Sequence, residues 1–253
     1  MKGLSVYFKK NVLNLFFLGL ASGIPFALIG GTLANWLTKS EIDRKSIGIL
    51  SSLMIFYSLK FLWSFLLDTV PLPFITKKFG FRRSWIAVSI LLLFFSIIIL
   101  GNFDPKVNLL GMAVCGLLVG FLSANLDIAI DAYRIDIVER ENQAAAAATY
   151  IWGYRFAMLV SGGGALYLSE YYSWQQVYLI MSFFVLFGFI PLFLLGEPKV
   201  EQQKFELKLK DTIGEKFRKL IFLPFKELSK YCFLSSVSQF MINLLYDTCC
   251  VSY

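Results

Sequence analysis

Apolar runs of roughly membrane-crossing length are the feature that most limits what this chain can fold into. A helix needs about 20 apolar residues to cross a bilayer, and a window of that size finds six such runs. They cover residues 11–37, 46–67, 85–100, 109–132, 144–168 and 175–195. The chain is 57% hydrophobic and only 16% charged, so a soluble fold would expose far too much apolar surface. We therefore predict an all-α, multi-pass membrane protein.

The composition of the chain changes after the sixth run, where charged residues become frequent. Residues 197–230 contain nine cationic and six acidic side chains, and residues 231–246 form a shorter apolar run. We predict a six-helix bundle over 1–196, a cytoplasmic linker over 197–230, and a partial seventh helix with an aberrant C-terminal end over 231–253. Two alternatives stay open. Residues 197–230 could lie on the inner leaflet as an amphipathic helix, and the run at 231–246 could stop short of crossing the membrane.

Lysine and arginine side chains between the runs indicate the orientation. With the N-terminus inside, nine lie on the cytoplasmic side and four on the outer side, even when the long stretch 197–230 is left out. Cytoplasmic loops have such an excess, so we predict a cytoplasmic N-terminus. The same placement accounts for the net charge of +7 without a nucleic-acid partner. The chain has no histidine and no CxxC pair among its four cysteines, so we expect no metal or other cofactor.

Three ionisable residues near the end of the fourth run share one face of the predicted helix. Asp127, Asp131 and Arg134 follow the i, i+4, i+7 spacing. A charge inside a membrane costs at least about 2.5–3.5 kcal/mol, and a helix that lines a polar cavity can tolerate this cost. Loss of water favours the protonated form of a carboxyl group, so both aspartates are candidates for proton coupling. Asp127 lies deeper, whereas Asp131 could instead be solvated or paired with Arg134 at the cytoplasmic edge.

Two cations, Lys60 and Arg155, fall inside apolar runs. Arg155 cannot lose its charge, so we expect it to pair with Asp127 or Asp131, or to bind an anionic cargo. Lys60 could line the same cavity, or its long side chain could reach the membrane surface. Glycines 162–164 could allow bending, although close helix packing would also explain them.

The loop between the second and third runs combines Asp68, Gly80, Arg82 and Arg83. This order of an aspartate, a glycine and a basic pair resembles the signature loop of the major facilitator superfamily, with a longer spacer. A carboxylate at a helix end can accept hydrogen bonds from arginine or from a helix N-terminus, and that contact can break in one of two conformations. These four residues are therefore candidates for a gating loop. Simple anchoring by cytoplasmic cations is the alternative.

Four further segments, at residues 19–25, 57–63, 123–132 and 153–163, resemble the AmpG-type muropeptide permease branch of that superfamily. The resemblance covers about residues 10–198. It implies a proton-driven permease of the bacterial inner membrane that imports anhydro-muropeptides released by cell-wall turnover. Relatives have Gln-Asp in the fourth span, whereas this chain has Leu126-Asp127 with its amide at Asn125. Asn125 is therefore a further candidate for the cavity.

The resemblance also implies what a complete transporter would need. A permease of this superfamily has two six-helix halves with the cargo between them. This chain then supplies the N-terminal half, the linker and part of a seventh helix, and residues 246–253 read as a truncation or frameshift remnant. Its expected partners are membrane lipids, protons, a muropeptide and either a second copy or a second half. An inactive gene remnant and a non-transporting membrane scaffold are the alternatives. An intramembrane aspartyl protease would need a Gly-x-Gly-Asp run, which the chain lacks, so we predict no enzyme activity.

Overall fold

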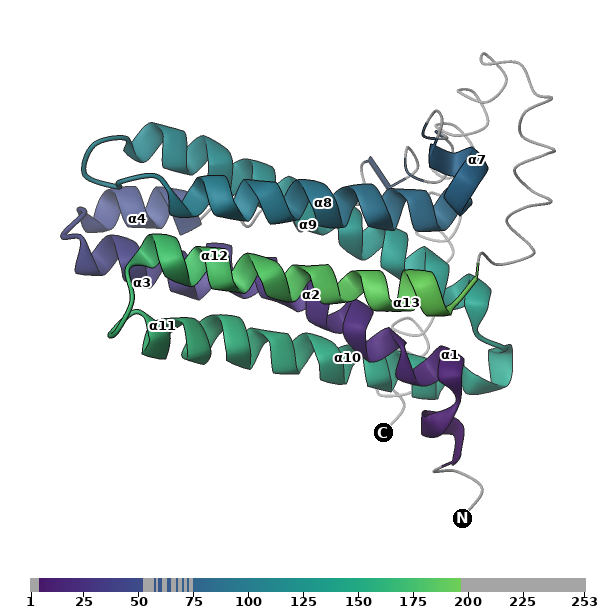
Figure 1. The fold of residues 1–253 in the computed structure, drawn as a ribbon. Coiled ribbons are helices and arrows are strands. Elements are labelled where there is room, and N and C mark those ends of the chain that lie inside the picture. The colour runs from purple at the N-terminus through teal and green to yellow at the C-terminus, as the bar shows by residue number, and fades with distance from the viewer. Residues whose placement is uncertain are drawn as a thin grey trace, which may run out of the picture. The chain divides into compact units, whose positions relative to one another are not determined.

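The computed structural model describes residues 5–51, eight single residues between 57 and 72, and residues 75–196. Every regular element in these ranges is helical, and the long helices lie side by side as a bundle (Figure 1). The all-α prediction is therefore confirmed. The predicted linker at 197–230 and the partial seventh helix at 231–253 lie outside the described residues.

The first predicted span is one helical segment of 30 residues, Lys10–Lys39. It consists of α1 (Lys10–Leu13), α2 (Leu15–Ala27), a π-helical turn η2 (Leu28–Thr32) and α3 (Leu33–Lys39). Pro25 lies inside α2, and Gly30 and Gly31 lie inside the π-helical turn. The glycine pair therefore changes the winding of the helix without ending it.

The other elements follow the predicted runs. They are η1 (Ser5–Phe8), α4 (Arg44–Ser51), α7 (Ile75–Phe79), α8 (Phe81–Gly101), α9 (Leu109–Ile137), η4 (Arg140–Asn142), α10 (Gln143–Leu159), η5 (Val160–Gly164), α11 (Ala165–Leu168), α12 (Trp174–Val185), η6 (Leu186–Gly188) and α13 (Phe189–Leu194). Helix α4 begins the second predicted run, most of whose remainder lies outside the described residues. Capping side chains fix where two of the helices begin. The Asn108 side chain caps the N-terminus of α9, and Ser173 and Gln176 form a capping box on α12.

Four helical segments in the described residues are long and apolar enough to cross a membrane. They are Lys10–Lys39, Phe81–Gly101, Leu109–Ile137 and Trp174–Leu194. The fifth predicted run is also helical throughout, as α10, η5 and α11, but it is not one of these four. It contains Arg155 and the polar, glycine-rich turn at 160–164, and both lower its hydropathy.

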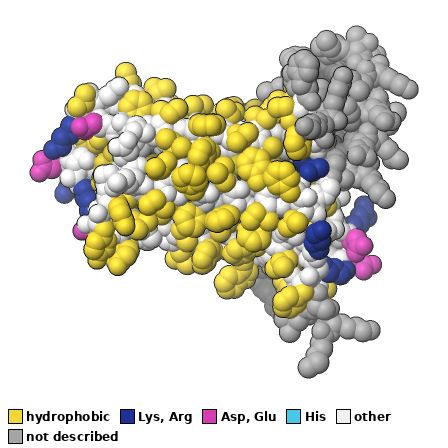
Figure 2. Space-filling view, viewed as in Figure 1, with side chains coloured by type: hydrophobic (Ala, Val, Ile, Leu, Met, Phe, Trp, Pro, Cys, Tyr) yellow, Lys and Arg dark blue, Asp and Glu magenta, His cyan; other side chains and the backbone are white. Residues whose placement is uncertain are grey.

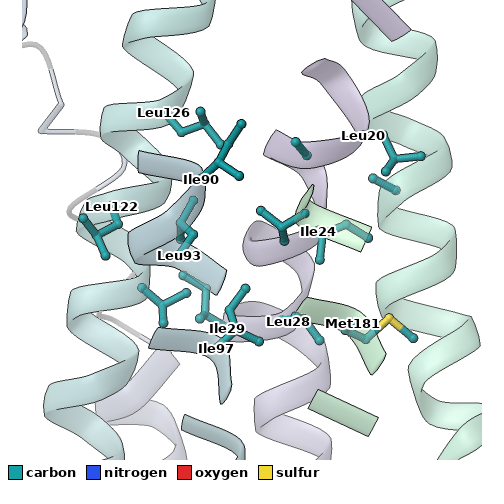
Figure 3. Close-up of a cluster of buried hydrophobic side chains, with 14 of the residues drawn as sticks. Leu20, Ile24, Leu28, Ile29, Ile90, Leu93, Ile97, Leu122, Leu126 and Met181 are labelled. Atoms are coloured by element: carbon teal, nitrogen blue, oxygen red, sulfur yellow. The ribbon is translucent and has the colours of Figure 1, made fainter. Parts of the chain in front are cut away.

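Helix α2 occupies the middle of the bundle and packs against α9, α10 and α12. Its Leu20 and Ile24, with Leu28 of the adjoining η2, meet apolar side chains from α8, α9 and α12 in a continuous core (Figure 3). Apolar side chains also cover much of the visible surface, while charged side chains gather toward its two ends (Figure 2). Large side chains such as Phe95, Trp152 and Phe193 are more than half exposed. A surface of this kind requires a lipid or protein environment, so the chain is a multi-pass membrane protein.

Glycine allows α2 and α10 to approach each other closely. A Cβ atom on Gly19 would collide with the backbone of Tyr150, and one on Gly153 would collide with the backbone of Phe16. Gly23 faces the backbone of Tyr154 in the same way. Small residues at helix contacts of this kind are common in membrane proteins. The contact matters for function because it brings polar side chains of α2 and α10 to α9.

Candidate functional site

Asp127 of α9 lies in the interior of the bundle, with 6% of its surface exposed. One of its oxygens, Oδ1, accepts hydrogen bonds from the Ser22 hydroxyl of α2 and, at 3.4 Å, from the Tyr150 hydroxyl of α10. The Tyr150 hydroxyl is also 3.2 Å from Ser22 Oγ. Its other oxygen, Oδ2, lies 3.6 Å from the ammonium nitrogen of Lys60. The two carboxylate oxygens therefore have different surroundings: two hydroxyls hold one, and a cation faces the other.

The glycine contact between α2 and α10 explains how Ser22 and Tyr150 converge. Tyr150 begins the stretch of α10 that packs on Gly19, and Ser22 lies next to Gly23 on α2. Larger residues at these glycines would separate the two helices and move both hydroxyls away from Asp127. The sequence motif around residues 19–25 thus has a structural reason to contain glycines and a serine together.

Side chains from the second predicted run complete the surroundings of α9. The Trp63 indole N–H donates to Asn125 Oδ1 at 2.8 Å, and the Tyr57 and Ser123 hydroxyls share a hydrogen bond. The ring of Phe26 of α2 packs edge-to-face against the ring of Tyr57, with 5.1 Å between ring centroids. Asn125, a predicted cavity residue, is therefore near Asp127 on α9, but its side-chain oxygen already accepts a hydrogen bond from Trp63. The region around Asp127 combines hydroxyls with aromatic rings.

The structure does not bring Arg155 to either of the two predicted aspartates in the described residues. Arg155 is exposed, and its guanidinium contacts the Met158 sulfur at 3.8 Å. In the part of the chain that the structure describes, it pairs with neither Asp127 nor Asp131. Arg155 follows Tyr150 by five residues, which turns it about 140° around the helix, away from the face that meets α2 and α9. The cation that reaches Asp127 is Lys60.

Asp131 lies one turn beyond Asp127 but in a different environment. Its side chain is 45% exposed and accepts from Arg134 at 3.2 Å. The Arg134 guanidinium also lies over the Tyr150 ring, 5.6 Å from its centroid. The structure thus has the arrangement expected if Asp131 pairs locally with Arg134. The two aspartates do not form one hydrogen-bonded pair.

The candidate gating residues have partners on other helices. Gly80 precedes α8 with a φ of 93°, a backbone conformation that favours glycine. Arg82 Nε lies 3.5 Å from Asp136 Oδ2 of α9, and Arg83 donates to the Leu192 carbonyl of α13. Both basic residues therefore link α8 to neighbouring helices. Asp68, the proposed carboxylate of the gate, lies outside the described residues.

Several residues of this site were not singled out from the sequence: Ser22, Tyr57, Trp63, Asp136 and Tyr150. Serine, tyrosine and tryptophan are frequent in membrane helices for many reasons, so their presence alone carried no signal. Asp136 is two residues from Arg134 and belongs to the same charged helix end. In the described residues, no group of three or more His, Cys, Asp or Glu side chains could hold a metal ion.

Comparison with known proteins decides the family. A sequence model of the Major Facilitator Superfamily matches residues 15–249. The chain belongs to the major facilitator superfamily. The described residues contain five long helical segments and α4, the start of the second predicted run, as expected for one six-helix half of that fold. Membership points to a transporter rather than an enzyme, in agreement with the predicted class.

Individual relatives narrow the resemblance within the superfamily. The anhydromuropeptide permease of Escherichia coli K12 is 38% identical over 217 residues, which are 83% of this chain and 43% of that protein. The putative transporter AmpG 4 of Rickettsia conorii is 34% identical over 209 residues, or 82% of this chain and 50% of that protein. The putative transporter AmpG 1 of Rickettsia conorii is 39% identical over 70% of this chain. The expected resemblance to AmpG-type permeases is confirmed. The chain spans about half the length of the curated relatives it matches.

Proposed function

We propose that this chain takes part in proton-coupled import of anhydro-muropeptides across a bacterial inner membrane. The buried carboxylate of Asp127 is the observation that supports this most directly. It is an acidic side chain inside a predicted membrane span, held by groups from two other helices and faced by a lysine. Ionisable groups at such positions typically belong to substrate, ion or proton pathways. The cargo class comes from the E. coli relative, whose name states an anhydromuropeptide.

The proposed role of Asp127 is to take up and release one proton per transport cycle. When ionised, its charge is balanced by Lys60 and by hydroxyl donors, so the carboxylate is tolerated in the interior. When protonated, it no longer attracts Lys60. A proton can therefore change the contacts between α9 and the second span, and a transporter needs such a change to couple a gradient to cargo movement.

The remaining parts of the proposal concern the whole assembly. A cargo cavity in this superfamily lies between two six-helix halves. We propose that a second copy of the chain, or a second half, completes it, and that the N-terminus faces the cytoplasm. In this arrangement Arg82 and Arg83 belong to the cytoplasmic end, where their contacts with α9 and α13 act as the gate.

The test is uptake by the purified chain in liposomes with an imposed pH gradient. Uptake of labelled anhydro-N-acetylmuramoyl-L-alanine should require the gradient, and Asp127→Asn should abolish it without loss of membrane insertion. Asp104→Asn is the matched control, because Asp104 lies in the turn before α9 and asparagine can make the same turn contacts. Uptake by Asp127→Asn equal to that of the control would refute the role of Asp127.

Chain density in the liposomes tests the partner. If two copies form the cavity, uptake per chain should rise with density and then level off. Uptake per chain that does not depend on density would contradict self-association. Gradient-driven uptake that appears only when a second-half polypeptide from a relative is added would identify a heterologous partner instead.

A further inference from the structure

The two oxygens of Asp127 have different neighbours, and one of those neighbours is a cation. Oδ1 already accepts from the hydroxyls of Ser22 and Tyr150. Oδ2 has the Lys60 ammonium 3.6 Å away. The hydroxyls of Ser22 and Tyr150 can accept as well as donate hydrogen bonds, so either oxygen of Asp127 can bind an arriving proton. In both cases the carboxyl group beside Lys60 becomes neutral.

Protonation of Asp127 ends the ion pair. A lysine ammonium has three donors and no acceptor, so it cannot accept a hydrogen bond from the protonated carboxyl group. The Coulomb attraction ends at the same time, because the carboxyl group becomes neutral. Among the described residues, Asp127 is the acid within ion-pair distance of Lys60. Within the described residues, the proton therefore leaves the Lys60 cation without its anion.

The other described groups around Asp127 cannot replace that anion. Ser22 and Tyr150 are neutral donors on Oδ1, and the Tyr57 phenol, which contacts Ser123 of α9, is uncharged as well. Asp131, on the same helix, is already paired with Arg134. The Lys60 side chain is 36% exposed, against 9% for Asp127, so its ammonium is the accessible member of the pair.

From this geometry, and resting on the proposed transport function, we infer that Lys60 is the specificity residue for a carboxylate on the cargo. The carboxylate of the cargo binds Lys60 when a proton has displaced Asp127 from it. The cargo class is therefore a molecule with a free carboxylate, such as the peptide end of a muropeptide, and one proton accompanies each carboxylate.

Charge balance supports the one-to-one ratio. In the empty site, ionised Asp127 and Lys60 sum to zero. In the loaded site, neutral Asp127, Lys60 and the cargo carboxylate also sum to zero. In either state the transporter can change conformation without an uncompensated charge in its low-dielectric interior. The state with a proton but no cargo, and the state with cargo but no proton, each keep one net charge and are disfavoured. Empty and fully loaded sites are thus the two that can change conformation.

The test uses the complete 253-residue chain in lipid nanodiscs and infrared difference spectra in the C=O stretching region of protonated carboxylic acids. Two probe pairs separate charge from shape: anhydro-N-acetylmuramoyl-L-alanine with its primary amide, and acetate with acetamide. At a pH at which the empty protein has Asp127 ionised, each carboxylate should produce a protonated-acid band and each amide should not. Asp127→Asn should remove the band, which assigns it.

Lysine variants test the residue itself. Lys60→Met should abolish the carboxylate-induced band, and Lys60→Arg should retain it, because arginine keeps the cation. The matched control is Lys106→Met, since Lys106 forms an ion pair of 3.7 Å with Glu41 at the end of the bundle. The affinity for the carboxylate probes should fall about tenfold per unit rise in pH in the wild type and stay constant in Asp127→Asn.

The outcomes separate this inference from the proposed function. A band with acetate but not with the muropeptide would keep the Lys60–Asp127 switch and reject the proposed cargo. Amides that produce the same band, or a Lys60→Met variant that keeps the wild-type response, would overturn the inference even if the chain imports muropeptides. A correctly folded wild type that shows no band with either carboxylate would overturn it as well.

Discussion

At the scale of single residues, the environment of Asp127 explains why a membrane helix tolerates an acid in its interior. A buried ion pair gains little unless the remaining lone pairs are also satisfied. Here Lys60 faces one oxygen, and two hydroxyls donate to the other. The hydroxyls therefore have a positioning role: they hold the carboxylate so that Oδ2 faces the lysine.

The hydroxyl of Tyr150 gives a prediction at this scale. Tyr150→Phe removes a donor to a buried carboxylate and should lower the free energy of unfolding by about 1.5–3 kcal/mol. Equilibrium unfolding of the chain in mixed micelles at neutral pH measures this change. The matched control is Tyr171→Phe, because the Tyr171 side chain is 69% exposed and should tolerate the change. Equal stability of the two variants would show that the Tyr150 hydroxyl does not support Asp127.

For single residues, the sequence predicted how deep a side chain lies along its membrane span. It did not predict the side of the helix from which that side chain points. Asp127 was correctly separated from Asp131, because position within the apolar run indicates burial. Arg155 was placed at a similar depth, yet its side chain leaves the opposite side of α10. Direction around a helix depends on which neighbours it packs against, and the apolar run of α10 is too uniform to indicate that face.

At the scale of elements, the sequence predicted where the helices lie but not where an α-helix changes to a π-helical turn. Five of the apolar runs, and the described start of the second run, coincide with helical segments because hydropathy over a window reports membrane insertion directly. The π-helical turns at Leu28–Thr32 and Val160–Gly164 had no signal beyond their glycines. These two turns lie against each other, and Thr32 Oγ1 donates to the Ser161 carbonyl at 2.7 Å. A wider turn exposes backbone carbonyls, and a hydroxyl from the neighbouring helix can satisfy one of them.

Glycines in these helices therefore have two separate roles, which substitution can distinguish. Gly153→Ala places a methyl group against the backbone of Phe16 and should lower the free energy of unfolding by about 1–3 kcal/mol, because the helices must separate. Gly163→Ala meets no atom within 4 Å and should be neutral or slightly stabilising.

The measurement is again equilibrium unfolding, combined with proton-linked uptake. Gly153→Ala should also reduce uptake, since Ser22 and Tyr150 would move away from Asp127. A Gly163→Ala variant that folds normally but transports poorly would show that the π-helical turn itself has a functional role. Equal tolerance at both positions would contradict the close packing of α2 and α10.

At the scale of the whole molecule, most ion pairs of the described bundle lie at its two ends, and the Lys60–Asp127 pair lies in the largely apolar interior. One end has Lys39 paired with Glu170, and Lys106 3.7 Å from Glu41. The other end has Lys9 3.8 Å from Glu139, together with the Arg82–Asp136 contact. This division could be predicted from loop charges. The contacts between the ends of individual helices could not, because they depend on which helices are neighbours.

The two ends allow a direct test of the predicted orientation. With the N-terminus in the cytoplasm, Lys106 lies outside the cell and Glu139 lies inside. In a variant whose four native cysteines are replaced by serine, Lys106→Cys should react with a membrane-impermeant maleimide added to bacterial cells whose outer membrane is permeable. Glu139→Cys should react only after the inner membrane is opened. Both positions are exposed, so a difference in labelling reports the side of the membrane and not burial. The reverse pattern would place the Arg82–Asp136 contact outside the cell, where a cytoplasmic gate is impossible.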